Sequence, residues 1–281
     1  MQRLFRFAVA TMAMVMVFYT LGQAGELRIA LTQAQAGDAR KYQPLLDYLL
    51  KKGVAATFVT AQDYQQAAEL FSKGAVDAMF SGSGIAGTLI IKELADPLVR
   101  PVSADGVSTY SAAVIAPKGG PLFNGSADYF TGKRVIFSPL ASAGEFYFHS
   151  LGPSRAREIL KAANHGAALD ALSRGLADVA IVKNHVWTKE AQKYPQLEKA
   201  GGDNGDNPDA TLMVSKIMDP ASIHKISGVL LGIKDDSSPE AIAVKTSLGI
   251  QSYIKTTTND FKHTIIMLKK AGVTKAFAFS Y

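Results

Sequence analysis

Cysteine is absent from the 281 residues, and its absence narrows the chemistry open to the chain. Disulfides, a thiol nucleophile and a zinc–thiolate site are excluded. A lipid-modified cysteine is excluded as well, so we do not expect a lipoprotein. The core alone must stabilise the fold, and a chain of this length can bury enough apolar surface to do so.

Signals for catalysis and for nucleic-acid binding are also scarce. The patterns G-x-S-x-G, H-E-x-x-H and G-x-x-x-x-G-K-[ST] do not occur. Lysine and arginine are spread along the chain, without an arginine-rich helix or an alternation with aromatic residues. The sequence therefore predicts no enzyme, no metal site, no cofactor and no nucleic-acid partner.

The N-terminal segment has the pattern of a secretory signal peptide. Arg3 and Arg6 precede an apolar run over residues 7–21, and small residues surround Ala24. The run is shorter than the roughly 20 apolar residues that a membrane helix needs, which disfavours the alternative of an uncleaved anchor. We predict a signal peptide over residues 1–24, cleavage after Ala24 and a periplasmic mature protein. Loss of the two arginines lowers the net charge from +6 to +4.

From residue 27 onward, short apolar runs alternate with segments of helical periodicity. Strands are predicted at residues 27–31, 54–60 and 76–80, with helices over 42–50 and 62–73 between them. Each helix ends in lysine and glycine, which suit a helix C-terminus. This alternation predicts an α/β fold with mostly parallel sheets flanked by helices.

A weak internal similarity indicates two lobes of one architecture. Residues 70–79 resemble residues 172–180: both have a helix end, a basic residue, a glycine and then a strand that carries Asp77 or Asp178. A generic connection between a helix and a strand would look the same, so the similarity is modest evidence by itself.

Two extended crossings are expected to connect these lobes, one near residues 110–117 and one near residues 210–215. The expected division assigns residues 25–115 to lobe 1, 116–212 to lobe 2 and 213–281 to a return to lobe 1 with C-terminal helices.

The stretch after the predicted strand at 135–137 has the features of an anion cradle. Ser138-Pro-Leu ends the strand, and Ser142 with Glu145 makes the S-x-x-E pattern of a capping box. Free N–H groups at the start of the helix predicted there would face an anion. Any α/β protein joins a strand to a helix in this way, so the pattern alone is not specific.

The order of several motifs along the chain resembles one family, the periplasmic phosphonate/phosphite/phosphate-type substrate-binding proteins of ABC transporters. The resemblance runs roughly over residues 27–216. The motifs are Tyr42-Gln-Pro-Leu-Leu-Asp-Tyr-Leu, Asp63-Tyr64, Gly74-Ala-Val-Asp77, Ser81-Gly-Ser83, Tyr110-Ser-Ala, Gly132-Lys-Arg-Val-Ile-Phe137, Ala141-Ser-Ala-Gly144, Asn164-His165-Gly and Gly175-Leu-Ala-Asp178.

The resemblance implies a hinged, two-lobed periplasmic binding protein of type II that closes on a small anion. It also implies a monomer, no cofactor and an inner-membrane ABC permease as partner. The ligand contacts implied for this sequence are Tyr64, Ser81, Gly82 and Ser83 in the first lobe, Tyr110 at the hinge, and Ala141, Ser142, Ala143, His165 and His185 in the second lobe.

Some of these residues also have a purely structural explanation. Tyr64 can begin a helix capped by Asp63, and Tyr110 can pack in the core or at the hinge. Ser142 and His165 can each serve as helix caps. Ligand contact and structural role therefore both stay open for these positions.

Two departures from the family pattern bear on the ligand. The family loop Ser-Thr-Ser-Gly reads Ala141-Ser-Ala-Gly144, which leaves one hydroxyl and fewer donors for a highly charged anion. Where relatives hold an ammonium group with acidic side chains, this sequence has His185 and Ala210, with Asp209 adjacent. We expect phosphate, phosphite, another oxyanion or a largely uncharged metabolite, and not an aminoalkylphosphonate.

Two other functions stay open at this point. A protein of the same fold can act as a sensor that reports its ligand to a membrane partner without transport. An exported enzyme that uses His165 and His185 for acid–base chemistry is the weaker alternative.

Overall fold

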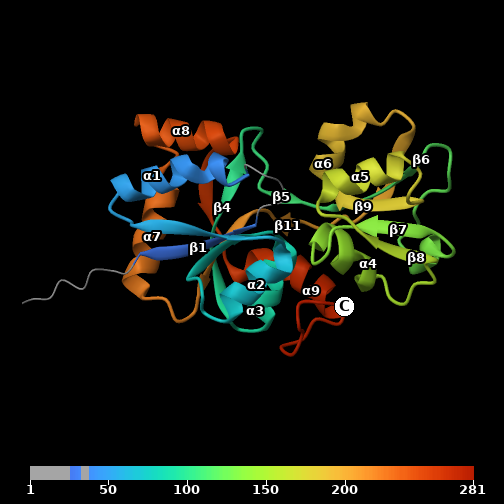
Figure 1. The fold of residues 1–281 in the computed structure, drawn as a ribbon, viewed down its shortest axis with the longest axis horizontal. Helices are drawn as coiled ribbons and strands as arrows, with labels where there is room; N and C mark the ends of the chain where they lie inside the picture. Colours follow the sequence, from blue (N-terminus) through green and yellow to red (C-terminus); the bar gives the residue numbers. More distant parts are fainter. Residues whose placement is uncertain (1–25, 33–37) are drawn as a thin grey trace, which may run out of the picture.

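The computed structural model describes residues 26–32 and 38–281. The predicted signal peptide lies outside the described residues. Figure 1 shows two lobes side by side, joined by thin connections near the centre. None of the helices in the described ranges is long and apolar enough to cross a membrane.

The first lobe is built on a six-stranded sheet with the order β13-β4-β12-β3-β1-β2. Its strands are β1 (Leu27–Thr32), β2 (Ala56–Ala61), β3 (Ala78–Ser81), β4 (Ala95–Ser103), β12 (Thr211–Ser215) and β13 (Ile250–Lys255). One hydrophobic cluster packs α1 (Gln43–Lys51), α7 (Pro220–Gly232) and α8 (Pro239–Leu248) on one face. A second cluster packs α2 (Tyr64–Ser72), α3 (Ser83–Ile91) and α9 (Lys262–Lys270) on the other face.

The second lobe is built on a five-stranded sheet with the order β10-β6-β9-β7-β8. Its strands are β6 (Ala112–Pro117), β7 (Arg134–Phe137), β8 (Glu158–Lys161), β9 (Val179–Lys183) and β10 (Leu197–Gly202). Its α-helices are α4 (Tyr147–Ser150), α5 (His165–Ser173) and α6 (Asn184–Glu190). Short helical turns complete the chain: η1 (Asp38–Tyr42), η2 (Ala127–Phe130), η3 (Ser142–Phe146), η4 (Ala191–Lys193) and η5 (Thr258–Phe261).

A two-stranded ribbon forms the hinge between the lobes. It pairs β5 (Thr109–Tyr110) with β11 (Asn207–Pro208) in antiparallel register, with Tyr110 opposite Asn207. The outgoing crossing is β5, at the start of the predicted stretch 110–117, because residues 112–117 are already β6 of the second sheet. The returning crossing lies earlier than residues 210–215, because residues 211–215 are already β12, paired with both β3 and β4 in the first sheet.

The α/β class is confirmed, but the sheets are mixed and not mostly parallel. In the first sheet β1 pairs in parallel with β2 and β3, whereas β12 and β13 pair antiparallel with their neighbours. In the second sheet β7 pairs in parallel with β8 and β9, and β6 pairs antiparallel with β9 and β10. β6 and β12 enter their lobes from the hinge ribbon and run against the strands of the βα units, whereas β13 follows α8 and pairs antiparallel with β4 at the edge of the first sheet.

The C-terminal segment contacts both lobes. α9 packs on α3 of the first lobe and on α4 of the second, and the chain end follows it. Phe146 of η3 lies against Phe277 and Tyr281, with ring centroids 5.9 and 5.8 Å apart. The ring of Tyr281 also stacks on His149 at 4.0 Å. We call this group of four side chains the aromatic contact.

Candidate functional site

The candidate site lies at the carboxyl ends of the strands that pair in parallel. β3 ends at Ser81 in the first lobe, and β7, β8 and β9 end at Phe137, Lys161 and Lys183 in the second. In α/β sheets, ligands bind in the crevice outside these ends. The segments that follow the four strands meet across the boundary between the lobes, next to the hinge.

Three buried hydroxyl groups converge at this boundary, and we call them the hydroxyl cluster. Ser83 Oγ lies 2.7 Å from Ser142 Oγ and 2.7 Å from the phenol oxygen of Tyr110, which lies 2.5 Å from Ser142 Oγ. The Ser83 N–H also donates to the Tyr110 oxygen at 3.2 Å. Since these residues belong to α3, β5 and η3, the cluster joins lobe 1, the hinge and lobe 2.

Helix α3 points its N-terminus at the hydroxyl cluster. Gly82 is its N-cap and supplies no side-chain capping bond, so the first N–H groups of the helix lack that usual partner. They carry the positive end of the helix dipole, which favours an anion.

Gly84, in the first turn of α3, brings the backbones of the two lobes into direct contact. A Cβ added there would lie 2.5 Å from the Leu140 carbonyl oxygen and 2.8 Å from the Ser142 nitrogen. Real Cβ atoms do not approach other atoms so closely, so a side chain at this position forces the lobes apart.

The prediction that Ser142 and Glu145 form a capping box is wrong. Ala143 and Gly144 leave the helical conformation, so residues 142–146 form an irregular turn whose N-cap, Ala141, makes no side-chain bond. The regular helix α4 begins only at Tyr147. Ser142 is thereby free of any capping role, and its hydroxyl joins the hydroxyl cluster.

Glu145 instead holds the loop that precedes it. Its carboxylate is buried and accepts a hydrogen bond from the Leu140 N–H at 2.8 Å, with Lys161 Nζ at 3.5 Å. Leu140 has a φ of +53°, in the left-handed region that non-glycine residues rarely adopt. The Glu145 carboxylate thus helps to keep this strained turn in place against Gly84.

A half-buried ion pair lies beside the hydroxyl cluster, and the sequence did not identify it as a unit. Lys183 Nζ lies 2.6 Å from the Asp209 carboxylate and 4.1 Å from the centre of the Tyr110 ring. Burial acts to lower the pKa of Lys183, but Asp209 and nearby tyrosines override it and leave the pKa above its ordinary value. Burial acts to raise the pKa of Asp209, and Lys183 holds it below its ordinary value. Both groups are charged at neutral pH.

His165 is the first residue of α5, and Asn164, not His165, caps that helix by accepting from the Ala167 N–H at 2.9 Å. The imidazole is buried, and its Nδ1 has no hydrogen-bond partner within the described part of the chain. Burial lowers the pKa of His165 to about 3, helped by Lys183, so its ring is neutral at neutral pH. A buried polar atom without a partner is rare and marks a place where a ligand atom can bond.

His185 is exposed and lies beside Asp209 and the ring of Tyr110. Its Nε2 is 3.8 Å from Asp209, and its ring meets the Tyr110 ring edge-on at 6.0 Å. Burial lowers its pKa, and the nearby Asp209 opposes this shift. Over residues 26–32 and 38–281, no group of three or more His, Asp or Glu side chains is placed to hold a metal ion.

A cavity of about 10 Å³ lies within this constellation, roughly the room that one water molecule needs. Six of the ten predicted contacts line it: Tyr64, Gly82, Tyr110, Ala141, Ser142 and His165. Ser83 joins them through the hydroxyl cluster. The hydroxyl of Ser81 instead donates to the adjacent Gly82 carbonyl at 2.9 Å, and neither Ala143 nor His185 lines the cavity. Gly84, Leu140 and Lys183 line it although the sequence did not identify them.

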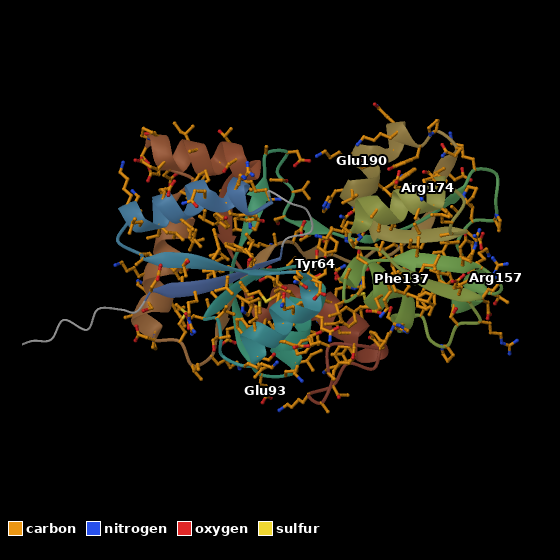
Figure 2. All side chains as sticks on the ribbon, viewed as in Figure 1. Tyr64, Glu93, Phe137, Arg157, Arg174 and Glu190 are labelled. Atoms are coloured by element: carbon orange, nitrogen blue, oxygen red, sulfur yellow. The ribbon has the colours of Figure 1, made fainter. Side chains whose placement is uncertain are left out.

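A wider cavity of about 330 Å³ opens next to the small one, also between the lobes. Gln62–Gln65 border it from the first lobe, and Pro139 and Lys161–Ala163 from the second. Tyr64 lines both cavities and lies near the junction of the lobes in Figure 2. Asp63 caps α2 by accepting from the Gln66 N–H at 2.8 Å, so it has the structural role considered for it.

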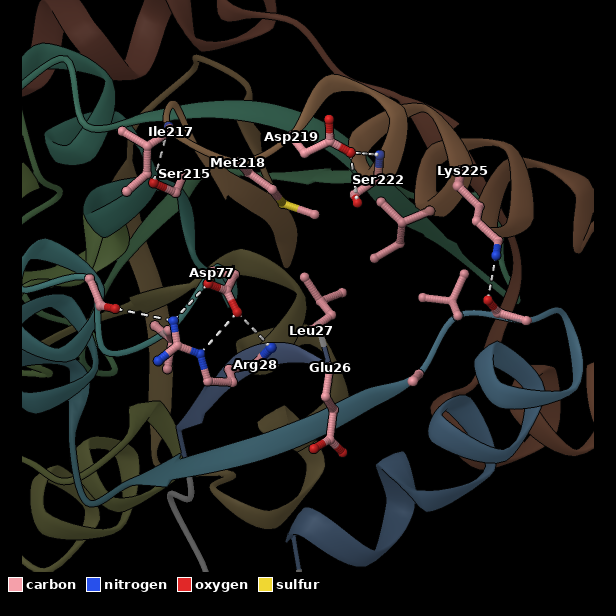
Figure 3. A pocket seen from close by; sticks show the side chains of 16 residues that line it. Glu26, Leu27, Arg28, Asp77, Ser215, Ile217, Met218, Asp219, Ser222 and Lys225 are labelled. Carbon is pink, nitrogen blue, oxygen red and sulfur yellow. Dashed lines mark hydrogen bonds and ion pairs between the residues drawn. The ribbon is translucent and has the colours of Figure 1, made fainter. Parts of the chain in front are cut away.

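A third cavity, of about 1070 Å³, is a groove on the first lobe alone (Figure 3). It lies at the amino ends of β1, β2 and β3, opposite to the ends where such sheets bind ligands. Its two cationic side chains bond to protein groups: Arg28 to Asp77 at 2.8 Å, and Lys225 to the Gly53 carbonyl. Position and charge therefore favour the smaller site between the lobes, despite the volume of the groove.

Comparisons with solved structures identify proteins of the same fold. XAC2383 from Xanthomonas citri, solved with chloride, shares 18% identity at a TM-score of 0.72, covering 88% of this chain and 97% of that one. PhnD1 from Prochlorococcus marinus, solved with methylphosphonate, shares 13% identity at a TM-score of 0.70, covering 88% and 98%. A binding protein component of an ABC phosphonate transporter from Pseudomonas aeruginosa shares 15% identity at a TM-score of 0.67, covering 87% and 86%.

These solved structures confirm the two-lobed fold of type II periplasmic binding proteins. No curated protein sequence matches the chain. The family described as ABC transporter, phosphonate, periplasmic substrate-binding protein matches residues 29–261, which is most of the sequence. The chain therefore belongs to the family of periplasmic substrate-binding proteins of phosphonate ABC transporters.

Proposed function

We propose that this member of the family binds a small phosphorus oxyanion without a positively charged group, such as methylphosphonate, phosphite or phosphate, and presents it to an inner-membrane ABC permease. The observation that carries the proposal is the hydroxyl cluster. Its members come from both lobes and the hinge, and they meet at the N-terminus of α3. An oxyanion placed there can take over hydrogen bonds that the hydroxyls now make to one another.

The donors around the cavity suit an oxyanion of modest charge. The hydroxyls, the first N–H groups of α3 and a neutral His165 all offer hydrogen bonds without a net charge. Lys183, the lysine that lines the small cavity, is balanced by Asp209. Since charge-assisted hydrogen bonds are the strong ones, the site relies on several neutral donors and a helix dipole. This agrees with the loss of two hydroxyls from the family loop.

Closure of the lobes is the mechanism that follows from the placement of the donors. A ligand that touches Ser83 on one lobe and Ser142 on the other bonds fully only when the lobes are together. It stabilises the closed arrangement by its higher affinity for that arrangement. The hinge ribbon, with its two short strands, is the place where the rotation would occur.

Titration of the mature protein, from Gly25 onward, tests the proposal. Thermal unfolding and calorimetry would compare methylphosphonate, phosphite and phosphate with sulfate and acetate. A ligand that binds only the folded state raises the unfolding midpoint with the logarithm of its concentration. We expect a saturable shift with at least one phosphorus oxyanion and no turnover of it. No shift with any phosphorus oxyanion, together with one for an uncharged metabolite, would overturn the proposal.

Export by the predicted signal peptide belongs to the same proposal. Mass spectrometry of the protein recovered from a periplasmic fraction would show a chain that begins at Gly25. Neither the sensor nor the enzyme hypothesis has a specific observation in its favour.

A further inference from the structure

The ammonium group of Lys183 is bound inside the site in the way that proteins bind ammonium groups of ligands. Its Nζ lies 2.6 Å from a carboxylate oxygen of Asp209 and 4.1 Å from the centre of the Tyr110 ring. A carboxylate together with an aromatic face is the usual composition of a cation-binding cage. Only 17% of the Lys183 side chain is exposed, so little water competes for the ammonium group.

This cage and the hydroxyl cluster share one side chain, Tyr110. Its ring face contacts the Lys183 ammonium, and its hydroxyl contacts Ser83 and Ser142. A place for a cation and a place for an anion thus lie one phenol ring apart. In a small zwitterion with a phosphonate at one end and an ammonium at the other, the two charges are spaced in a similar way.

The charge of the cage carboxylate is already balanced by the ammonium group of Lys183. One oxygen of Asp209 accepts from Lys183 and from the Ala210 N–H at 2.9 Å, and the other has His185 Nε2 at 3.8 Å. A ligand ammonium that entered the cage would meet Lys183 as a like charge. It would have no carboxylate of its own to pair with, and burial of an unpaired charge is costly.

We propose that Lys183 determines specificity: its ammonium occupies the cage of Asp209 and Tyr110, so the site accepts oxyanions without a positive group and rejects aminoalkylphosphonates. This inference rests on the proposed function. It names the ligand class that the same site excludes and the side chain that excludes it.

The experiment compares methylphosphonate with 2-aminoethylphosphonate by calorimetry on the wild type and on Lys183→Ala. Wild type should bind methylphosphonate and discriminate against the amino compound by about 100-fold, the equivalent of a displaced ion pair. Lys183→Ala vacates the cage and should bind 2-aminoethylphosphonate at least about tenfold more tightly than wild type does.

Two control variants test whether the effect depends on the charge of Lys183 and on its place in the site. Lys183→Met keeps the length of the side chain without its charge, so it should fill the cage and show no such gain. Lys161→Ala removes a lysine of the neighbouring cavity and should leave the ratio of the two affinities unchanged. Lys183→Ala leaves the Asp209 carboxylate unpaired and can fail to fold for that reason. The double variant Lys183→Ala with Asp209→Asn removes this charge. This double variant should gain nothing for the amino compound.

The outcomes distinguish this inference from the proposed function. If wild type binds methylphosphonate and 2-aminoethylphosphonate equally well, the role of Lys183 is wrong and the proposed function stands. If a folded Lys183→Ala protein binds the amino compound no better than wild type does, the inference also fails. If wild type binds no phosphorus oxyanion at all, the proposed function fails and the inference fails with it.

Discussion

The boundary between the lobes has a polar part and an aromatic part, and the two differ in what they can do. The hydroxyl cluster holds the lobes together through groups that a ligand can use instead. The aromatic contact holds them together through rings that no ligand replaces, such as Tyr281 on His149. The loop over residues 140–146 connects the parts, with Ser142 in the first and Phe146 in the second. The side chains that would recognise the ligand are therefore neighbours of the side chains that stabilise closure, but they are not the same ones.

The largest effect on ligand binding is expected from Gly84→Ala. This substitution pushes the lobes apart and so disrupts both the polar and the aromatic part of the boundary. The added Cβ would lie 2.5 Å from the Leu140 carbonyl, so the closed arrangement becomes strained. We expect calorimetry to show affinity for the phosphorus oxyanion reduced by about 100-fold, or about 2.8 kcal/mol. Gly228→Ala is the matched control, because a Cβ there meets nothing within 4 Å. Unchanged affinity of Gly84→Ala would contradict the close approach of the lobes.

Removal of one hydroxyl affects the polar part alone. Ser142→Ala and Ser83→Ala should each weaken binding by about tenfold, the worth of roughly one hydrogen bond to a charged group. The double variant should lose less than the sum of the two, since each hydroxyl bonds to the other. Ser173→Ala, whose hydroxyl donates to the Asp170 carbonyl, should bind normally. Equal losses from Ser173→Ala and Ser142→Ala would show that the site is misplaced.

His165 makes the polar part sensitive to acid. Its pKa is about 3 when folded and near 6.5 when unfolded, so unfolding takes up a proton between these values. The free energy of unfolding is therefore highest, as far as it depends on His165, above pH 6.5, and it falls as the pH drops towards 3. Urea unfolding should show that the free energy of unfolding falls by about 1–2 kcal/mol more in wild type than in His165→Gln between pH 7.5 and pH 5. Parallel pH profiles for the two proteins would contradict a buried, neutral His165.

The smallest effect is expected from the aromatic part. Tyr281→Ala removes the stacking on His149 and the edge contact with Phe146, which together stabilise closure by about 0.5–1.5 kcal/mol. Ligand affinity should fall by about two- to tenfold, with the preference among oxyanions unchanged. A changed preference would mean that the aromatic contact takes part in recognition, and the division into two parts would then be wrong.

Local patterns in the sequence predicted the parts of the fold that depend on neighbours in the chain. The strands that became β1, β3 and β7 and the Asp63 cap of α2 follow from short-range periodicity and capping chemistry. Strand direction did not, because it depends on how the chain returns to each sheet, through the hinge for β6 and β12 and after α8 for β13. The capping box at Ser142 failed because Ala143 and Gly144 adopt a turn that the S-x-x-E pattern does not reveal.

Prediction of the candidate site was limited in the same way, by contacts between residues far apart in the sequence. Tyr110 and Ser142 could be identified through the family resemblance, which carries long-range information. The pairing of Lys183 with Asp209 could not, because it joins the end of β9 to the residue after β11, which come together only through the fold. The signals in the sequence were a lysine at the carboxyl end of a buried strand and Asp209 beside a position where relatives carry an acidic side chain. Gly84 likewise reads as an ordinary helical glycine until Leu140 lies against it.

The most direct test of the central claim is to follow the backbone amide resonances of the mature protein while methylphosphonate is added. If the ligand binds at the junction of the lobes, the amides of Ser83, Gly84 and Ser142 shift and saturate together. The amides around Arg28 and Ser222, in the large groove of the first lobe, stay in place. Saturable shifts confined to the groove, with none at Ser83 or Ser142, would contradict the site proposed for this protein.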